Sequence, residues 1–228
     1  MSTQETWLIS LAIGPVQDFI AAALRTRDLW FGSHMLSEVS KAAARALIEH
    51  KAVLIFPAVE DRTKLNSGSP LNVANRIVAQ VQGDKKTVEA IVEAGKEAAK
   101  QELALFIKQA WKQTDKLTEL REDIWEHQAQ PNDLLELYGT AARITEQGPQ
   151  AYKEARKRLD QLTSARKNSR NFNQSAAKPN KEPFYGLPKS SLDGRRETVL
   201  QKVTDKEKDK QVRRKLRMGD GEQLDILG

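Results

Sequence analysis

The chain has 228 residues, enough for one sizeable hydrophobic core with an appendage or for two small domains. It contains no cysteine, which excludes disulfides, thiolate zinc sites, iron–sulfur clusters and cysteine nucleophiles, and a reducing cytoplasm is the expected location. No apolar run approaches the roughly 18 residues that a membrane helix requires, so we expect a soluble protein without membrane contact.

The net charge of +6 is unevenly distributed along the chain. Residues 150–217 carry 20 Lys and Arg against 8 Asp and Glu, whereas residues 1–149 carry 17 against 20. Such a basic block suits contact with phosphates or with an acidic partner. A solvated basic tail is an equally good interpretation of the same composition.

The first elements are indicated by apolar runs and their breakers. Residues 6–13 form a nearly continuous apolar run that ends at Gly14-Pro15, which predicts a central strand buried on both faces. A helix is expected from Val16, and Gly32-Ser33 predicts a bend between two helical pieces. Short runs rich in β-branched residues then predict a second strand over 52–56 and a third over 75–81, separated by a loop.

The next segments complete a recognisable order. Residues 85–126 keep a helical period and predict one long helix or two in succession. Residues 134–144 predict a fourth strand, although their Ala and Leu content also allows a helix. The order β-α-β-β-α-β predicts an α+β, ferredoxin-like fold, with two helices on one face of a four-stranded antiparallel sheet. We assign this domain to residues 1–148.

Residues 149–228 differ in character from the first domain. A basic helix is expected over 151–165, a loop over 166–188, and a charged, weakly amphipathic segment over 204–218. We therefore predict a basic helical and loop segment after the ferredoxin-like domain.

The common signatures of a self-contained enzyme are missing from the sequence. The three histidines, His34, His50 and His127, lie far apart without a His or Asp partner at metal-ligand spacing, so surface or core positions are the better interpretation. The sequence has no P-loop, nucleophile elbow or dinucleotide fingerprint. We predict no catalytic residue and no metal site in this chain.

The most informative stretch begins where the first strand ends. Gly14 and Pro15 lead from a buried strand into a helix N-terminus, whose free N–H groups can hold an anion such as a phosphate. Gly14 permits close backbone approach. Pro15 has no backbone N–H, and in a first helical turn that N–H would have no partner within the helix. A plain strand-to-helix connection explains the same residues, and from the physics alone it is the favoured interpretation.

This stretch carries a family resemblance. Ile13-Gly14-Pro15-Val16-Gln17-Asp18-Phe19-Ile20, then Arg25-Thr26-Arg27-Asp28-Leu29-Trp30-Phe31-Gly32-Ser33, resembles the opening of the first palm domain in the large, polymerase/cyclase-like subunit of type III-B (Cmr-type) CRISPR effector complexes. Residues 72–81 resemble that family's Pro-Asn-Arg strand, with Val73-Ala74 where a Pro is usual. Residues 221–225 resemble the Gly-Glu-Gln-Leu-Asp that leads toward the second half of the subunit.

The resemblance implies a function that this sequence carries only in part. In the family, two ferredoxin-like palms bind ATP between them, and a Gly-Gly-Asp-Asp motif in the second palm holds metal for cyclic oligoadenylate synthesis. Many members also begin with an HD nuclease domain. This sequence has neither a Gly-Gly-Asp-Asp nor a His-Asp pair, so we expect the first palm plus the inter-palm region, a shared ATP site, and no activity from this chain alone.

The resemblance also implies particular site residues. The expected nucleotide-binding residues are Gly14, Pro15, Val16, Gln17, Phe19, Arg27, Asp28, Gly32 and Ser33. Gln17 and Ser33 are expected to hydrogen-bond a base or ribose. Phe19 is open to stacking or to packing, and for Phe19, Leu29 and Trp30 core packing is the favoured interpretation. Asn75 and Arg76 are expected to fix a strand end rather than to touch ligand.

The inter-palm region is expected to lack zinc and to meet RNA or a neighbouring subunit. Many relatives carry a zinc-binding Cys-x-x-Cys-Gly-x-Arg-Glu where this chain has residues 190–197, without either thiolate. We expect a metal-free turn there. The residues expected to contact crRNA, target RNA or another subunit are Arg166, Lys167, Arg170, Arg195 and Arg196, and a solvated basic loop is nearly as good an interpretation.

Two functions follow as hypotheses. The first is a nucleotide-binding and scaffolding part of the large subunit, whose partners are the other Cmr-type subunits, the remainder of the large subunit and, indirectly, crRNA and target RNA. The alternative is a stand-alone ferredoxin-like RNA-binding protein. The predicted strand over 75–81 contains no aromatic residue for base stacking, which counts against the alternative.

Overall fold

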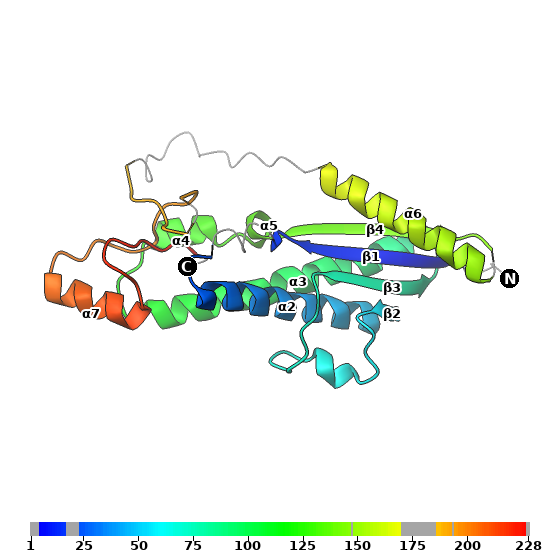
Figure 1. Cartoon of the computed structure of the whole chain (residues 1–228), viewed down its shortest axis with the longest axis horizontal. Helices are drawn as coiled ribbons and strands as arrows, with labels where there is room; N and C mark the ends of the chain where they lie inside the picture. The colour runs from blue at the N-terminus through cyan, green and yellow to red at the C-terminus, as the bar shows by residue number, and fades with distance from the viewer. Residues whose placement is uncertain (1–4, 17–22, 147, 170–185, 193, 227–228) are drawn as a thin grey trace.

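The computed structural model describes residues 5–16, 23–146, 148–169, 186–192 and 194–226. Figure 1 shows the elements in chain order. They are β1 (Thr6–Gly14), α2 (Thr26–Glu49), β2 (Val53–Phe56), the 3-10 turn η1 (Arg62–Leu65), β3 (Arg76–Gln82), α3 (Lys85–Thr114), α4 (Glu122–Gln128), α5 (Pro131–Leu134), β4 (Glu136–Ile144), α6 (Pro149–Asn168) and α7 (Lys206–Leu216).

The four strands form one antiparallel sheet in the order β2-β3-β1-β4. Strands that are consecutive in the chain but separated by a helix therefore have another strand between them, as the split β-α-β arrangement requires. This order confirms the predicted α+β, ferredoxin-like fold. It also confirms residues 134–144 as a strand rather than a helix over most of their length.

The central strand β1 is buried on both faces. Leu8, Ile9, Leu11, Ala12 and Ile13 are each at most 1% exposed. Because side chains alternate along a strand, such a run needs apolar cover on each side of the sheet. The continuous apolar run in the sequence is thus a direct consequence of the central position of β1.

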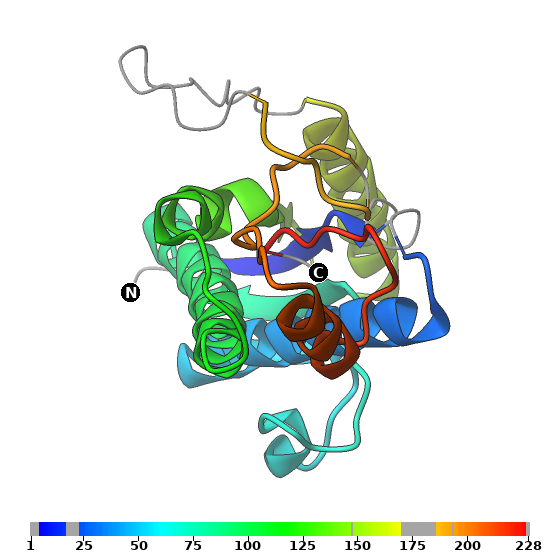
Figure 2. The same cartoon turned by 90° about the vertical axis from the view of Figure 1, so that its left-hand side faces the viewer.

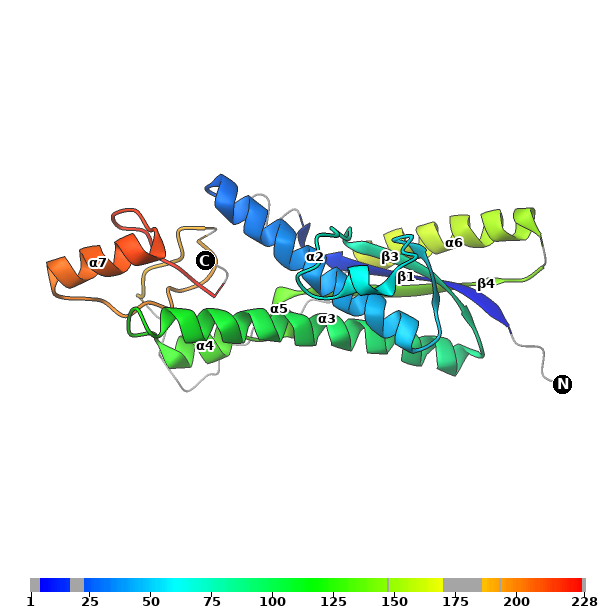
Figure 3. The same ribbon diagram turned by 90° about the horizontal axis from the view of Figure 1, so that it is seen from below.

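The first face of the sheet is covered by α2 and α3, which Figure 3 shows crossing beneath it. Ile9, Leu11 and Ile13 of β1 join the main core with residues of both helices. Gly95 of α3 permits the close approach, because a Cβ there would lie 3.0 Å from a methyl of Leu47 in α2 and 3.2 Å from one of Leu11. A larger residue at Gly95 would push the two helices and the strand apart.

The second face of the sheet is covered by α6, the basic helix expected after residue 149. Its buried positions, Ala151, Ala155, Leu159 and Thr163, recur every four residues, and Ala155 and Leu159 pack on Leu8 of β1. The hydroxyls of Thr140 in β4 and Thr163 are 2.8 Å apart. The sheet is therefore covered on both faces, with α2 and α3 opposite α6 (Figure 1).

The structure contradicts one helix prediction and decides between the two alternatives of another. The bend expected at Gly32-Ser33 is wrong, because α2 runs without interruption from Thr26 to Glu49 and Gly32 is buried within it. A single glycine costs a helix only about 1 kcal/mol, which tertiary packing readily outweighs. The long helical stretch is two helices, since α3 ends at Thr114 and α4 begins at Glu122.

One end of the molecule extends beyond the sheet. The second half of α3, with α4, carries residues 186–226 there, as Figure 2 shows in orange and red. Leu120, Trp125, Val199 and Ile226 belong to the same core cluster as the inner face of β1. We call residues 186–226 the end lobe. No helix in the described part of the chain has the length and apolar character needed to cross a membrane.

A buried ion pair fixes the β2–β3 connection to α2. Lys41 and Glu38 are 1% and 3% exposed, and the Lys41 Nζ donates to Glu38 Oε1 at 2.6 Å and to the Ser69 carbonyl at 2.8 Å. The Gly68 N–H donates to Glu38 Oε2 at 2.9 Å. Burial alone would raise the pKa of Glu38, but the hydrogen bonds from Lys41 and Gly68 hold it below its ordinary value.

We predict that breaking this pair destabilises the fold strongly. Lys41→Met leaves a carboxylate buried without its partner, which costs about 3–5 kcal/mol, and Glu38→Leu with Lys41→Met costs less than the single change. Denaturant unfolding measures both. Lys85→Met, whose partner Glu89 is exposed, changes stability by less than about 1 kcal/mol. Equal effects at Lys41 and Lys85 would contradict the prediction.

The same pair predicts a pH dependence. Because the pKa of Glu38 is lowered in the folded chain, its contribution to stability is fully present above the unfolded pKa. That contribution is lost as the pH falls through the lowered folded pKa. Unfolding measured from neutral to acid pH should therefore show a loss in the wild type that Glu38→Gln does not share.

Candidate functional site

The C-terminal end of β1 brings a carboxylate against Gly14. Gly14 pairs in register with Glu136, the first residue of β4, and a Cβ on Gly14 would lie 3.5 Å from Glu136 Oε2. The Tyr138 hydroxyl donates to the same oxygen at 3.0 Å. On the other edge of β1, the Asn75 side chain donates to the Ile13 carbonyl at 3.0 Å. Asn75 thus lies where a residue that fixes the strand end should lie.

Near this strand end, two residues expected at different sites are connected through a chain of contacts. The Arg166 guanidinium lies over the ring of Tyr138, 5.7 Å from its centroid, a cation–π arrangement. Gly14, expected to bind nucleotide, and Arg166, expected to contact RNA or a subunit, are therefore linked through Glu136 and Tyr138. No sequence pattern pointed to Glu136 and Tyr138, because only strand pairing places them beside Gly14.

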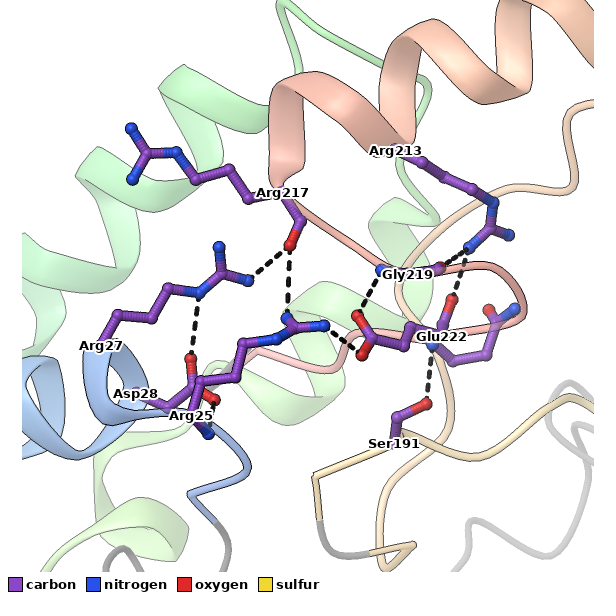
Figure 4. Close-up of polar contacts among 9 residues, drawn as sticks. Arg25, Arg27, Asp28, Ser191, Arg213, Arg217, Gly219 and Glu222 are labelled. Atoms are coloured by element: carbon purple, nitrogen blue, oxygen red, sulfur yellow. Dashed lines mark hydrogen bonds and ion pairs between the residues drawn. The ribbon is translucent and has the colours of Figure 1, made fainter.

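The N-terminus of α2 carries the second part of the site. The Asp28 carboxylate accepts a 2.9 Å hydrogen bond from the backbone N–H of Arg25, the residue that precedes the helix. The side chains of Arg25 and Arg27 both donate to the carbonyl of Arg217, at 3.3 Å and 2.6 Å. Asp28 thus caps the helix, and both arginines point toward the end lobe (Figure 4).

A carboxylate from the end lobe lies against these arginines. One oxygen of Glu222 accepts from Arg25, and the other accepts from the Gly219 N–H at 2.7 Å. Arg213 holds the same loop by donating to the carbonyls of Gly219 and Glu222 at 3.1 Å and 3.0 Å. We call the contacts that join Arg25 and Arg27 to Arg217 and Glu222 the clamp, shown in Figure 4.

The electrostatics of the clamp favour an anion beside α2. The hydrogen bond from Arg25, the Gly219 N–H and the positive charges of Arg25 and Arg27 hold the pKa of Glu222 below its ordinary value. The N-terminus of a helix adds a partial positive charge of its own. This end of α2 therefore favours an anionic oxygen as its ligand.

The expected nucleotide-binding residues are distributed unevenly around this region. Pro15 and Val16 follow Gly14 and are partly exposed, and Gln17 and Phe19 lie outside the described residues. Arg27 belongs to the clamp and Asp28 caps α2, whereas Gly32 is buried and Ser33 is exposed. Neither the groove along α6 nor the one beside α4 is lined by any of these residues.

Core packing of Leu29 and Trp30 is a wrong prediction. Leu29 is 42% and Trp30 66% exposed. The reason is geometric, because the first turns of α2 project past the end of the sheet (Figure 3). Trp30 instead stacks on His34, with centroids 5.3 Å apart, and Phe31 contacts Phe106 of α3 edge to face. We call Trp30, Phe31, His34 and Phe106 the aromatic patch.

The expected RNA or subunit contacts are divided between two places. Arg166 and Lys167 close the last turn of α6, whereas Arg195 and Arg196 belong to the end lobe. The end lobe and α6 are separate segments in Figure 1. Arg196 lies 3.8 Å from the buried carboxylate of Asp225. Arg170 lies outside the described residues. These cations therefore do not form one surface within the described part of the chain.

The segment that replaces the zinc motif is held by local hydrogen bonds. The Ser190 hydroxyl accepts from the Leu192 N–H at 3.3 Å, and the Ser190 carbonyl accepts from the Gly194 N–H at 3.1 Å. Asp193, within residues 190–197, lies outside the described residues. Among the described residues, no three His, Cys, Asp or Glu side chains gather as metal ligands. Val199, which follows this turn, is buried in the main core.

Comparisons with known proteins bear on the first half of the chain. Residues 8–116 match the family described as CRISPR-associated protein Cmr2, N-terminal. A solved structure with similarity is the crystal structure of Csm1 in T. onnurineus, at 17% identity and a TM-score of 0.41. That match covers 72% of this chain and 20% of the other, so this chain spans about a fifth of that chain's length. No curated protein matches.

The family match and the fold together define the class of the protein. Through residues 8–116, the chain carries part of the large subunit of a type III CRISPR effector complex. More narrowly, it carries the N-terminal part of a Cmr2-type large subunit, the type III-B form, which confirms the resemblance seen in the motif from Ile13 to Ser33. The matched residues include Gly14, α2 with its arginines and the aromatic patch.

We predict that Glu222→Gln loosens the clamp without unfolding the chain. A neutral amide loses the charge-assisted bond from Arg25, so amide hydrogen exchange at Gly219 and Gln223 should become several-fold faster while β1 stays protected. In the wild type, the clamp should persist below the ordinary pKa of a glutamate and weaken as the pH falls through the lowered value.

A matched variant isolates the effect of the clamp. Glu207→Gln removes a carboxylate from the exposed start of α7, where its partner is Lys210 at 3.1 Å. Exchange at Gly219 should remain as in the wild type. If both variants speed exchange in the end lobe equally, the clamp does not hold it.

Proposed function

We propose that the chain is the nucleotide-binding and scaffolding part of the large subunit of a type III-B CRISPR effector complex. It acts in the cytoplasm with the other Cmr-type subunits, with the remainder of the large subunit and, indirectly, with crRNA and target RNA. ATP is the proposed ligand, shared with a second palm of the large subunit.

The observation that carries the nucleotide proposal is the clamp at the N-terminus of α2. Arg25 and Arg27 donate there to a carboxylate and to a carbonyl, so the site already receives anionic and polar oxygens. A nucleotide phosphate presents the same kind of acceptor, and helix N-termini favour it. The donor set therefore fits a triphosphate. The exposed Ser33, six residues after Arg27 in α2, adds a hydroxyl partner.

Glu136 gives the proposed site a definite chemical character. Its carboxylate beside Gly14 would repel a bare phosphate, whereas it suits the edge of a base or a ribose hydroxyl as an acceptor. We therefore expect the sugar or base toward Gly14 and Glu136, and the phosphates toward Arg25 and Arg27.

The aromatic patch supports the scaffolding role. Apolar side chains this exposed at adjacent positions of a helix mark interaction surfaces in soluble proteins. Trp30 and Phe31, with Phe106, lie on the same overhanging end of the molecule as the clamp. The remainder of the large subunit is the proposed partner that covers them.

The structure weakens the alternative of a stand-alone RNA-binding protein. In RNA-recognition motifs, the sheet face opposite the two helices presents aromatic side chains to bases. Here α6 covers that face, and the residues of β1 and β3 directed toward it include Leu8, Ser10 and Val78, which are buried.

We predict weak ATP binding by the chain alone, because a half-site supplies only part of the contacts. Backbone amide shifts on ATP addition should centre on Gly14 to Phe19 and on Arg27 to Ser33. Arg27→Ala should weaken binding about tenfold, as expected for the loss of one charged hydrogen bond. Arg62→Ala, an exposed arginine on η1, should leave the affinity unchanged.

One outcome would contradict the placement of the site, and another would contradict the expected inactivity of the chain alone. Shift changes that spare both segments would remove the site from α2 and Gly14. Cyclic oligoadenylate made from ATP by the pure chain with Mg²⁺ or Mn²⁺ would contradict the expectation that metal-holding aspartates elsewhere in the large subunit are required.

We also predict that the aromatic patch docks the remainder of the large subunit. Trp30→Ser should reduce their association at least tenfold in a titration of the two purified parts, since a buried tryptophan is a typical hot spot. Because Trp30 is 66% exposed in this chain, its own stability should change little. Val53→Ser, at a position 67% exposed on β2, is the matched control and should bind normally.

A further inference from the structure

The outer face of α6 is a strongly basic surface to which neither the sequence motifs nor the family match assigns a role. Lys153, Arg156 and Lys157, with Tyr152, Asp160, Gln161 and Ser164, line a shallow groove of about 700 Å³. Lys153 and Lys157 are both exposed and are one helical turn apart, about 6 Å along the axis. We call this surface the α6 basic face.

Two of the cations on this face have no local counter-charge. The carboxylate of Asp160 is taken up by an ion pair with Arg76 of β3 and lies 3.7 Å from Arg156. Within the described residues, Lys153 and Lys157 have no ion-pair partner. The two lysines are therefore available to an external anion.

The α6 basic face is also held in a fixed orientation. The opposite side of the helix buries Ala155 and Leu159 on the sheet, and Thr163 bonds both Thr140 and the Leu159 carbonyl. Packing of this kind leaves the helix little freedom to roll. The cations thus form a preorganised row rather than a flexible tail, which reduces the cost of binding.

We propose that the α6 basic face binds the sugar–phosphate backbone of a nucleic-acid strand, independently of base sequence. Lys153, Arg156 and Lys157 contact phosphates, while Gln161 and Ser164 offer hydrogen bonds to phosphate or sugar oxygens. The inference is independent of the proposed ATP site. It adds a direct nucleic-acid contact at residues other than the arginines expected from the sequence.

The composition of the face favours a nucleic acid over an acidic protein. Protein interfaces have an apolar centre and are depleted in lysine, whereas nucleic-acid interfaces are polar and strongly positive. Of the large exposed apolar side chains in the described residues, α6 carries only Leu162, at 39% exposure. Such a surface offers charge and hydrogen bonds but little area for apolar docking.

The test is a binding titration of the full chain with a fluorescein-labelled, mixed-sequence single-stranded RNA at several KCl concentrations. The variant Lys153→Glu with Lys157→Glu should bind at least tenfold more weakly. Its salt slope should fall by roughly 1 for each lysine that contacts a phosphate. Because both side chains are exposed, its unfolding midpoint should match the wild type.

A matched variant separates this face from net charge. Lys108→Glu with Lys112→Glu makes the same charge change at the same four-residue spacing on α3, at two exposed positions. It should leave the RNA affinity within about twofold, as expected for screened charges away from the contact. Equal losses in the two double variants, or none in the α6 variant, would overturn the proposal.

Competition identifies the class of partner. Unlabelled RNA of unrelated sequence should displace the labelled strand, whereas polyglutamate at the same charge concentration should displace it poorly. Equal displacement by polyglutamate would overturn the assignment to a nucleic-acid backbone and indicate an acidic protein instead.

Discussion

The burial of β1 on both faces is the constraint on which the rest of the structure depends. Leu8 and Leu11 point to opposite sides of the sheet and are fully buried, so each side must supply apolar cover. The pair α2 and α3 covers one side, and α6 covers the other. Because β1 also pairs along both edges, its register places Gly14 opposite Glu136 and Ile13 beside Asn75. The core thereby sets the position of the groups around Gly14.

The candidate functional groups lie where helices extend past the end of the sheet. A 24-residue helix is about 36 Å long, whereas the nine residues of β1 span about 30 Å, so helix ends overhang a sheet of this size. The first turns of α2 carry Arg25, Arg27 and the aromatic residues into that overhang. The second half of α3 supports the end lobe, which returns Glu222 to the arginines. The first turns of α2 lie beyond the sheet, so their arginines and exposed aromatic groups are left for contacts with other segments or partners.

Short-range patterns predicted what depends on neighbours in the sequence, and missed what depends on the fold. The four strands and their order followed from apolar runs and alternation. The sheet-covering role of α6 did not, because its buried positions are mostly small, such as Ala151 and Ala155, and lie among lysines and arginines. Gly14 and Arg27 were found through a family motif. Their partners Glu136 and Glu222 were missed, since Arg25 and Glu222 are 197 positions apart and no pattern links them.

The packing of α6 on the sheet also orients its proposed binding face. The same four-residue repeat that buries Ala155 and Leu159 sets the angle at which Lys153 and Lys157 face outward. Arg76 contributes to both, because it reaches from β3 to Asp160 of α6 and to the Ser10 hydroxyl on the same sheet face. A cavity at Leu159 would therefore disturb the sheet and the basic face together. Charge changes at the exposed lysines would alter only the outer surface, which is why those lysines, rather than the apolar positions, can separate binding from folding.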